Sequence, residues 1–359
     1  MISSLQALRF IFALFIFFQH FPIRNEEPRA LLDGAGYMGV SFFLVLSGFV
    51  MSLGYAEKVK GPDFKWGTFM KKRLVRLWPL HLLCLAIWMI FAYGQWGKEA
   101  LQPLPLVGNA LLLQAWFPIK EMEGNGVAWC LSDLILFYGL FPFLMRMKPK
   151  NLGVTLLSLI VMCWGLYYAL PISDDLLFWY WYKLPISRLC DFILGILSYH
   201  IYQYVSQEYF HRIWGGVSPV KRRLMELAPL LLYALAFAYI DSGRGGIHPS
   251  VYYYLPSCLV IFIFALVDKS KDKAGVPALI SQRWLIYLGE VSFSFYMIHN
   301  LVILFCKKVF DIASLSTPWQ IRFAVTLPVA IAISILVNKY YEEPITAWLS
   351  KRLFRKDAK

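Results

Sequence analysis

Ten apolar stretches, each close to the length that crosses a bilayer, account for most of this 359-residue chain. A spanning helix needs roughly 20 mainly apolar residues, because each residue adds about 1.5 Å across a hydrocarbon core of about 30 Å. The stretches lie at 5–21, 37–55, 77–95, 128–146, 152–170, 186–204, 226–240, 251–267, 285–306 and 321–341. Backbone polar groups in lipid must be satisfied within the segment. The sequence therefore predicts an all-α, polytopic transmembrane bundle of about ten spans.

Two apolar regions are shorter than the rest. The run at 226–240 is a short span, and "PLVGNALLLQAWFP" at 105–118 is too short to cross. We expect the latter segment to be interfacial or re-entrant. The N-terminus has neither a basic region nor a small-residue cleavage site, so 5–21 is expected to be a retained span.

The distribution of lysine and arginine predicts the orientation of the spans. With a cytoplasmic N-terminus, 23 of the 35 basic residues fall in cytoplasmic segments, 8 fall outside and 4 fall within spans. The cytoplasmic segments are 56–76, 144–151, 205–225, 268–284 and 342–359, and the outer ones are 22–36, 96–127, 171–184, 241–250 and 307–320. This positive-inside asymmetry predicts that both termini are cytoplasmic. The net charge of +13 thus indicates topology and contact with anionic lipids, and no nucleic-acid partner.

The first span contains two ionisable side chains, Arg9 and His20, in an otherwise apolar run. A charged group at bilayer depth costs at least ~2.5–3.5 kcal/mol on insertion scales, so such a group marks a functional-site hypothesis. Eleven residues separate the two by roughly 16 Å along a helix axis. In the predicted orientation the cation lies toward the cytoplasm and the imidazole toward the outer face.

A second basic group lies on the cytoplasmic side of the third span. Arg73 and Arg76 are spaced i, i+3 and share a helix face, and Glu342 and Glu343 end the tenth span on the same side. Guanidinium groups bind phosphate bidentately and stay charged, so the two arginines are candidates for an anionic ligand. The alternative is a pair of topological anchors whose side chains extend to the lipid head groups.

Five polar residues fall in the outer half of the spans. They are His20, Asp133, Arg188, Asp191 and His299. Arg188 and Asp191, again i, i+3, could form a structural ion pair, and a single histidine could be a helix contact. Five such residues on four or five spans favour a polar pocket within the membrane. Ser47 and Gly48, together with Gly195, indicate close helix approach.

Seven segments in order resemble one family of integral-membrane acyltransferases, the acyltransferase-3 family. They are Arg9 with His20, "GVSFFLVLSGF" at 39–49, "RLVRLWP" at 73–79, "WCLSDLILFY" at 129–138, "RLCDFILGI" at 188–196, "LGEVSFSFYMIH" at 288–299 and "YYEEP" at 340–344. The chain departs from the family pattern at two positions. Leu134 stands where a glutamate is usual, one residue after Asp133, and Ser41 stands where an aspartate is common.

The resemblance implies that residues 1–345 form a transmembrane domain of this type, followed by a basic cytoplasmic tail at 346–359. It implies a multi-pass protein of the bacterial cytoplasmic membrane that acylates surface carbohydrate. The donor is expected to be cytoplasmic acyl-CoA, acetyl-CoA in the first instance, and the acceptor a hydroxyl of a cell-surface or lipid-linked carbohydrate. Without a fused esterase-like domain, the chain is expected to deliver the acyl group itself.

Residue roles follow from the resemblance and from side-chain chemistry together. Arg9, Arg73 and Arg76 are predicted to bind the donor phosphates. Histidine titrates near about pH 6.5, so His20 suits a general base, and a covalent acyl-histidine relay is the variant. Asp133 and Asp191 are the candidates to orient His20. Arg188, His299 and Ser47 are predicted to shape the substrate pocket.

Other functions are weighed against this one. A multi-span transporter of an anionic substrate also fits a polar midplane cluster, although the chain shows no convincing internal repeat. A scaffold of a polysaccharide assembly complex is the third reading. The six cysteines are scattered singly without a CxxC pair, so we predict no metal site and no bound cofactor besides the acyl-CoA substrate.

Overall fold

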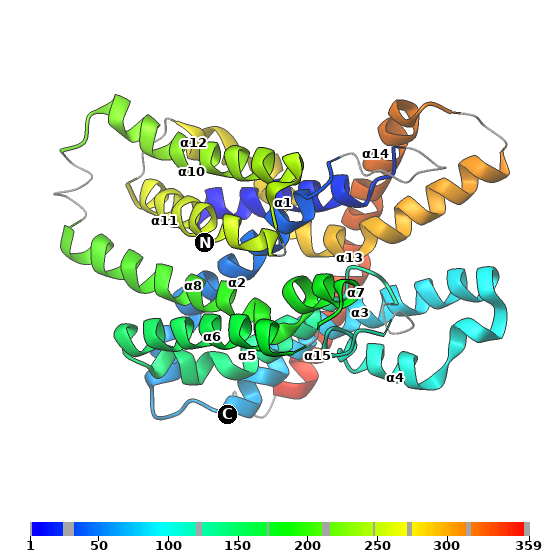
Figure 1. Cartoon of the computed structure of the whole chain (residues 1–359), viewed down its shortest axis with the longest axis horizontal. Helices are drawn as coiled ribbons and strands as arrows, with labels where there is room; N and C mark the ends of the chain where they lie inside the picture. The colour runs from blue at the N-terminus through cyan, green and yellow to red at the C-terminus, as the bar shows by residue number, and fades with distance from the viewer. Residues whose placement is uncertain are drawn as a thin grey trace. The chain divides into compact units, whose positions relative to one another are not determined.

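The computed structural model describes residues 2–23, 32–119, 124–170, 172–209, 216–246, 248–270, 275–313 and 317–354. Within these ranges all the labelled elements are helices (Figure 1). Ten of them are long and apolar enough to cross a membrane. They are α1 (Ser3–His20), α2 (Ala35–Lys60), α3 (Trp66–Trp96), α5 (Trp129–Arg146), α6 (Pro149–Ala169), α8 (Pro185–Tyr204), α10 (Pro219–Tyr239), α11 (Tyr254–Ser270), α13 (Arg283–Ile312) and α14 (Trp319–Val337). The predicted all-α architecture of about ten spans is confirmed.

Shorter helices connect or extend these spans. They are α4 (Pro103–Ala110), α7 (Asp174–Phe178), α12 (Val276–Ile280) and α15 (Glu343–Phe354), with short 3-10 and π turns η1 (Gly97–Leu101), η2 (Gln114–Trp116), η4 (Trp179–Lys183), η5 (Val205–Tyr209), η6 (Ile240–Arg244), η7 (Pro249–Tyr253) and η8 (Asn338–Glu342). Several helices begin with a proline in their first turn, where the missing N–H would have no partner within the helix. Pro149, Pro185 and Pro219 start three of the spans in this way.

One expected boundary differs from the structure. The seventh span is not short, because α10 begins at Pro219, with Ser218 as its N-cap accepting from the Lys221 backbone N–H at 3.4 Å. Its first turns carry charged residues, which an apolar count leaves out. Residues 346–354 of the predicted tail belong to α15, and 355–359 lie outside the described residues.

The chain divides into two compact units, and three spans contribute to both. Unit 1 comprises Met1–Phe15, Gly34–Phe64 and Gly139–Glu290, and unit 2 comprises Ile16–Asp33, Lys65–Tyr138 and Val291–Lys359. The divisions fall inside α1, α5 and α13.

Unit 1 is built on close contact between α2 and α8. A Cβ atom on Gly48 would overlap the carbonyl oxygen of Phe192, and one on Gly195 would overlap that of Val45. Only glycine permits backbones to approach this closely. The predicted close helix approach at Gly48 and Gly195 is therefore confirmed.

In unit 2, the short segment after α3 is held beside α3 and α5 by polar contacts. His81 Nε2 donates to the Asn109 carbonyl at 2.8 Å, and Gln114 Nε2 donates to the Ala128 carbonyl at 2.8 Å. Ser132 Oγ donates to the carbonyl of Leu112, a residue with a positive φ of 59°. These contacts hold α4 and η2 against the neighbouring helices. Both elements are short, as expected for a stretch that is too short to span the membrane.

Candidate functional site

Unit 2 brings together two histidines from opposite ends of the sequence. His20 is the last residue of α1, and His299 lies in α13. His20 Nδ1 and His299 Nε2 are 3.3 Å apart, and the ring centroids are separated by 5.2 Å. His299 is completely buried, whereas His20 is partly exposed. The predicted convergence of these two residues thus takes the form of a direct contact.

Backbone carbonyls determine which nitrogens of the pair carry protons. His20 Nδ1 lies 2.8 Å from the Ile16 carbonyl, so Nδ1 must be the donor. His299 Nδ1 lies 2.8 Å from the Tyr296 carbonyl and 3.2 Å from the Phe295 carbonyl, so it is a donor too. The contact between the rings then requires His299 Nε2 to accept from His20 Nδ1–H. In this arrangement His20 Nε2 carries the lone pair.

Apolar rings surround the histidine pair. The Phe295 ring stacks on His299 with an interplanar angle of 22°, and the Phe17 ring lies 6.2 Å from it between centroids. The backbone carbonyls of Ile16, Phe295 and Tyr296 and the contact between the two rings therefore help to orient the imidazoles.

Asp133 lies in the same unit, near the N-terminus of α5, and is completely buried. Leu134, which stands where the family pattern has glutamate, is half-buried on the same helix. A role for Asp133 in orienting His20 stays a prediction.

The arginines of the third span also lie in unit 2. Arg76 Nη1 forms an ion pair with Glu342 Oε1 at 3.2 Å, and the Glu342 side chain is 1% exposed whereas that of Arg76 is 43% exposed. Glu342 also accepts from Ser294 Oγ and, at 3.2 Å, from Asn338 Nδ2. The guanidinium of Arg73 lies 5.5 Å from the Phe69 ring. Arg76 therefore forms an ion pair with Glu342 while part of its side chain stays exposed.

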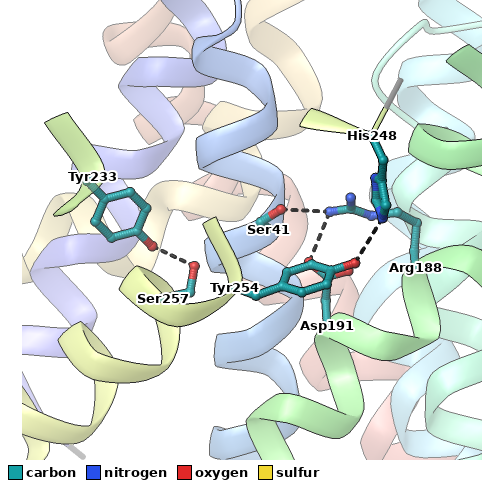
Figure 2. A network of polar contacts seen from close by, with 7 residues as sticks. All are labelled: Ser41, Arg188, Asp191, Tyr233, His248, Tyr254 and Ser257. Carbon is teal, nitrogen blue, oxygen red and sulfur yellow. Dashed lines mark hydrogen bonds and ion pairs between the residues drawn. The ribbon is translucent and has the colours of Figure 1, made fainter. Parts of the chain in front are cut away.

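In unit 1, Arg188 and Asp191 form a fully buried network (Figure 2). Arg188 Nη2 donates to Asp191 Oδ1 at 3.2 Å and to Ser41 Oγ at 3.0 Å. The ion pair that the i, i+3 spacing allowed is thus present. Ser41, where the family pattern has aspartate, supplies a neutral acceptor to the guanidinium, which also lies 5.7 Å from the centre of the Tyr182 ring.

His248 lies beside this network, close enough to Arg188 to be affected by its charge. A hydrogen bond of 3.4 Å joins Tyr254 OH and His248 Nε2, as Figure 2 shows, and the imidazole stacks on Trp181 at 4.5 Å and 18°. Burial, and secondarily the Arg188 charge, lower the pKa of His248 to about 3. His248 is therefore neutral at physiological pH.

The remaining predicted residues belong to unit 1. Arg9 is half-buried on α1, and Ser47 is half-buried on α2. The sequence alone did not predict a direct contact within either of two residue pairs, Arg76 with Glu342 and His20 with His299. Both residues of each pair had been assigned to the same side of the membrane, and this was the available signal.

Known proteins identify the class of this polytopic helical protein. The chain matches the acyltransferase domain of the acyltransferase-3 family over residues 2–339, and it belongs to this family. It is 26% identical to an acyltransferase, MdmB, of Streptomyces mycarofaciens, over 98% of this chain and 93% of the relative. Protein 2 in the picA locus of Rhizobium radiobacter is 35% identical over 23% of this chain and 41% of its own. No solved structure matches the chain.

Proposed function

We propose that the protein is a multi-pass enzyme of the bacterial cytoplasmic membrane. It transfers an acyl group, acetyl in the first instance, from cytoplasmic acyl-CoA to a hydroxyl of a cell-surface or lipid-linked carbohydrate. Family membership and the likeness to an acyltransferase support acyl transfer. The observation that carries the proposal is His20, whose Nδ1 donates to the Ile16 carbonyl at 2.8 Å and leaves the Nε2 lone pair for proton transfer.

The reaction exchanges a thioester for an oxygen ester. His20 Nε2 takes the proton of the acceptor hydroxyl while that oxygen attacks the thioester carbonyl. The tetrahedral intermediate collapses, the carbon–sulfur bond breaks, and the proton on His20 passes to the thiolate, which leaves as the free thiol of CoA. General base catalysis of this kind contributes about 10²–10⁴-fold.

The basic residues fit the donor. Arg9, Arg73 and Arg76 are proposed to bind the CoA phosphates at the cytoplasmic side, where guanidinium groups can bind phosphate bidentately. Arg76 is exposed enough to reach a ligand while it contacts Glu342. Both termini are then cytoplasmic.

The acceptor is proposed to be recognised by residues on several spans. Arg188 and Ser47 are the proposed pocket residues of unit 1, with Asp191 beside Arg188. Asp133 and Asp191 are the proposed candidates for a carboxylate that orients His20.

The proposal is tested by following the transfer of label to saccharide from acetyl-CoA labelled in its acetyl group, in inside-out membrane vesicles. Wild type is compared with His20→Ala and with His81→Gln, a buried histidine of the same unit that donates to a backbone carbonyl. We expect transfer by wild type and His81→Gln and none by His20→Ala at equal membrane levels. No transfer by wild type with several donors and acceptors, together with uptake of an anion, would favour the transporter.

Tag accessibility tests the orientation. A tag placed within residues 205–225 should be protected from an impermeant reagent in intact cells and become reactive after permeabilisation. A reactive tag in intact cells would place the basic segments outside and remove the arginines from the donor side.

A further inference from the structure

We propose that His299 is a positioning residue that acts together with the Ile16 carbonyl to hold the tautomer and orientation of His20, a role for which the sequence suggested a carboxylate. This inference rests on the proposed function, because it concerns how the base of that reaction is oriented. It is carried by the hydrogen bonds of the two imidazoles in unit 2.

The hydrogen bonds run in one direction through the pair. His299 Nδ1–H donates to the Tyr296 carbonyl at 2.8 Å, and this leaves His299 Nε2 as an acceptor. His20 Nδ1 lies 3.3 Å from that acceptor and 2.8 Å from the Ile16 carbonyl. Two acceptors thus face one nitrogen of His20, and both require Nδ1 to carry the proton.

The consequence for catalysis concerns the other nitrogen. A neutral imidazole with the proton on Nδ1 has its lone pair on Nε2, the atom proposed to take the acceptor proton. The alternative tautomer would place a hydrogen on Nε2 and abolish its basicity there. A base oriented by a hydrogen-bond acceptor behind it is the arrangement of a catalytic triad, in which a carboxylate usually fills that position.

A neutral acceptor suits this site better than a carboxylate in one respect. His299 is completely buried beside Phe17 and Phe295, where an anion would lose its hydration. An imidazole supplies the acceptor without a charge. It also stabilises the protonated His20 less than a carboxylate would, so the proton is more easily returned to the leaving thiolate.

Two substitutions of His299 separate the positioning role from a packing role. The amide of His299→Gln reaches the position of Nε2 and can accept from His20, whereas His299→Asn reaches only the position of Nδ1. We expect kcat to fall about 100-fold in His299→Asn, with an unchanged KM for acetyl-CoA, and to stay within about 10-fold of wild type in His299→Gln. The corresponding changes at His81 serve as controls for the loss of a buried histidine, and kcat is referred to the amount of folded protein in detergent.

The results can contradict the inference in distinct ways. Equal losses in the Asn and Gln variants, full activity in both, or a raised KM for the saccharide with unchanged kcat would each overturn it, the last in favour of a role in the acceptor pocket. If wild type itself transfers nothing, the proposed function fails instead.

A second measurement needs neither activity nor a variant that folds well. The nitrogen-15 spectrum of histidine-labelled wild type in bilayers distinguishes protonated from unprotonated ring nitrogens. We expect a protonated Nδ1 on His20 and an unprotonated Nε2 on His299, assigned with the His299→Gln spectrum where that variant folds and by sequential correlations otherwise. A proton on Nε2 of either residue overturns the inference.

Discussion

Each unit contains a pair of interacting polar side chains, and the two pairs differ in the kind of interaction that joins them. In unit 1, Arg188 and Asp191 neutralise one another, and Ser41 occupies a further position on the cation. In unit 2, His20 and His299 are joined by hydrogen bonds that run in one direction, from His20 Nδ1–H to His299 Nε2 and from His299 Nδ1–H to the Tyr296 carbonyl. The Arg188–Asp191 pair, here called the closed pair, lies within α8, and its hydrogen bond to Ser41 joins this helix to α2. A directional pair fixes the protonation of one atom, which is what a base requires.

Breaking the closed pair should have the largest effect on stability. Asp191→Ala leaves a fully buried guanidinium without its carboxylate, and removal of one partner of a buried ion pair costs about 3–5 kcal/mol. We expect a strong loss of folded protein and of melting temperature in detergent. The double variant Arg188→Met/Asp191→Leu removes both charges and should recover much of the loss, because apolar replacements of buried pairs are often neutral. A double variant no better than the single one would show that the charges are not the reason.

The sequence predicted interactions along one helix better than those between helices. Arg188 and Asp191 are three residues apart, so their pairing was one of two open interpretations before the structure. The ten spans were also predictable, because bilayer thickness dictates their length. The start of α10 was missed, since its first turns carry basic residues that an apolar count excludes.

Contacts between distant segments required the structure. His20 and His299 were assigned to the same half of the membrane, but their contact depends on how α1 and α13 are rotated about their axes. The pairing of Arg76 with Glu342 likewise depends on the turn η8 that follows α14. Topology restricts the depth of a side chain in the membrane, but it does not determine which neighbouring helix that side chain faces.

A lower pH should reduce the stability of the folded protein through His248, which lies beside the closed pair. Its pKa is lowered to about 3 in the folded protein, so the unfolded chain takes up a proton below about pH 6.5 while the folded state does not. The stabilisation is complete above pH 6.5 and is lost as the pH falls toward 3, at up to about 1.4 kcal/mol per pH unit. His248→Phe keeps a ring against Trp181 and cannot titrate. We expect its melting temperature to fall less than that of wild type between pH 7 and 4.5, and parallel curves would contradict this.

Replacing Ser41 tests how much the stability provided by the closed pair depends on the neighbouring hydroxyl. Ser41→Ala removes an acceptor of the buried guanidinium, and the loss of a bond to a charged group costs about 1.5–3 kcal/mol. Ser52→Ala on the same helix is the matched control, because Ser52 Oγ donates only to its own helix at Gly48, 2.8 Å away. We expect the melting temperature to drop clearly more for Ser41→Ala. Equal drops would mean that the hydroxyl contributes packing alone.

A third pair, Arg76 with Glu342, has features of both clusters, since one partner is buried and the other is 43% exposed. If Arg76 binds donor phosphate, Glu342 competes with the ligand for the same guanidinium. Glu342→Gln removes the competing charge and keeps a side chain that can accept from Ser294 or Asn338. We therefore expect KM for acetyl-CoA to fall several-fold, equivalent to about 1 kcal/mol, with kcat unchanged. Arg76→Gln should raise KM. A KM that responds to Arg76→Gln and not to Glu342→Gln would show that the ion pair does not restrain the arginine. A KM unaffected by either change would assign Arg76 to the closed, structural kind of pair and leave donor binding to Arg9 and Arg73.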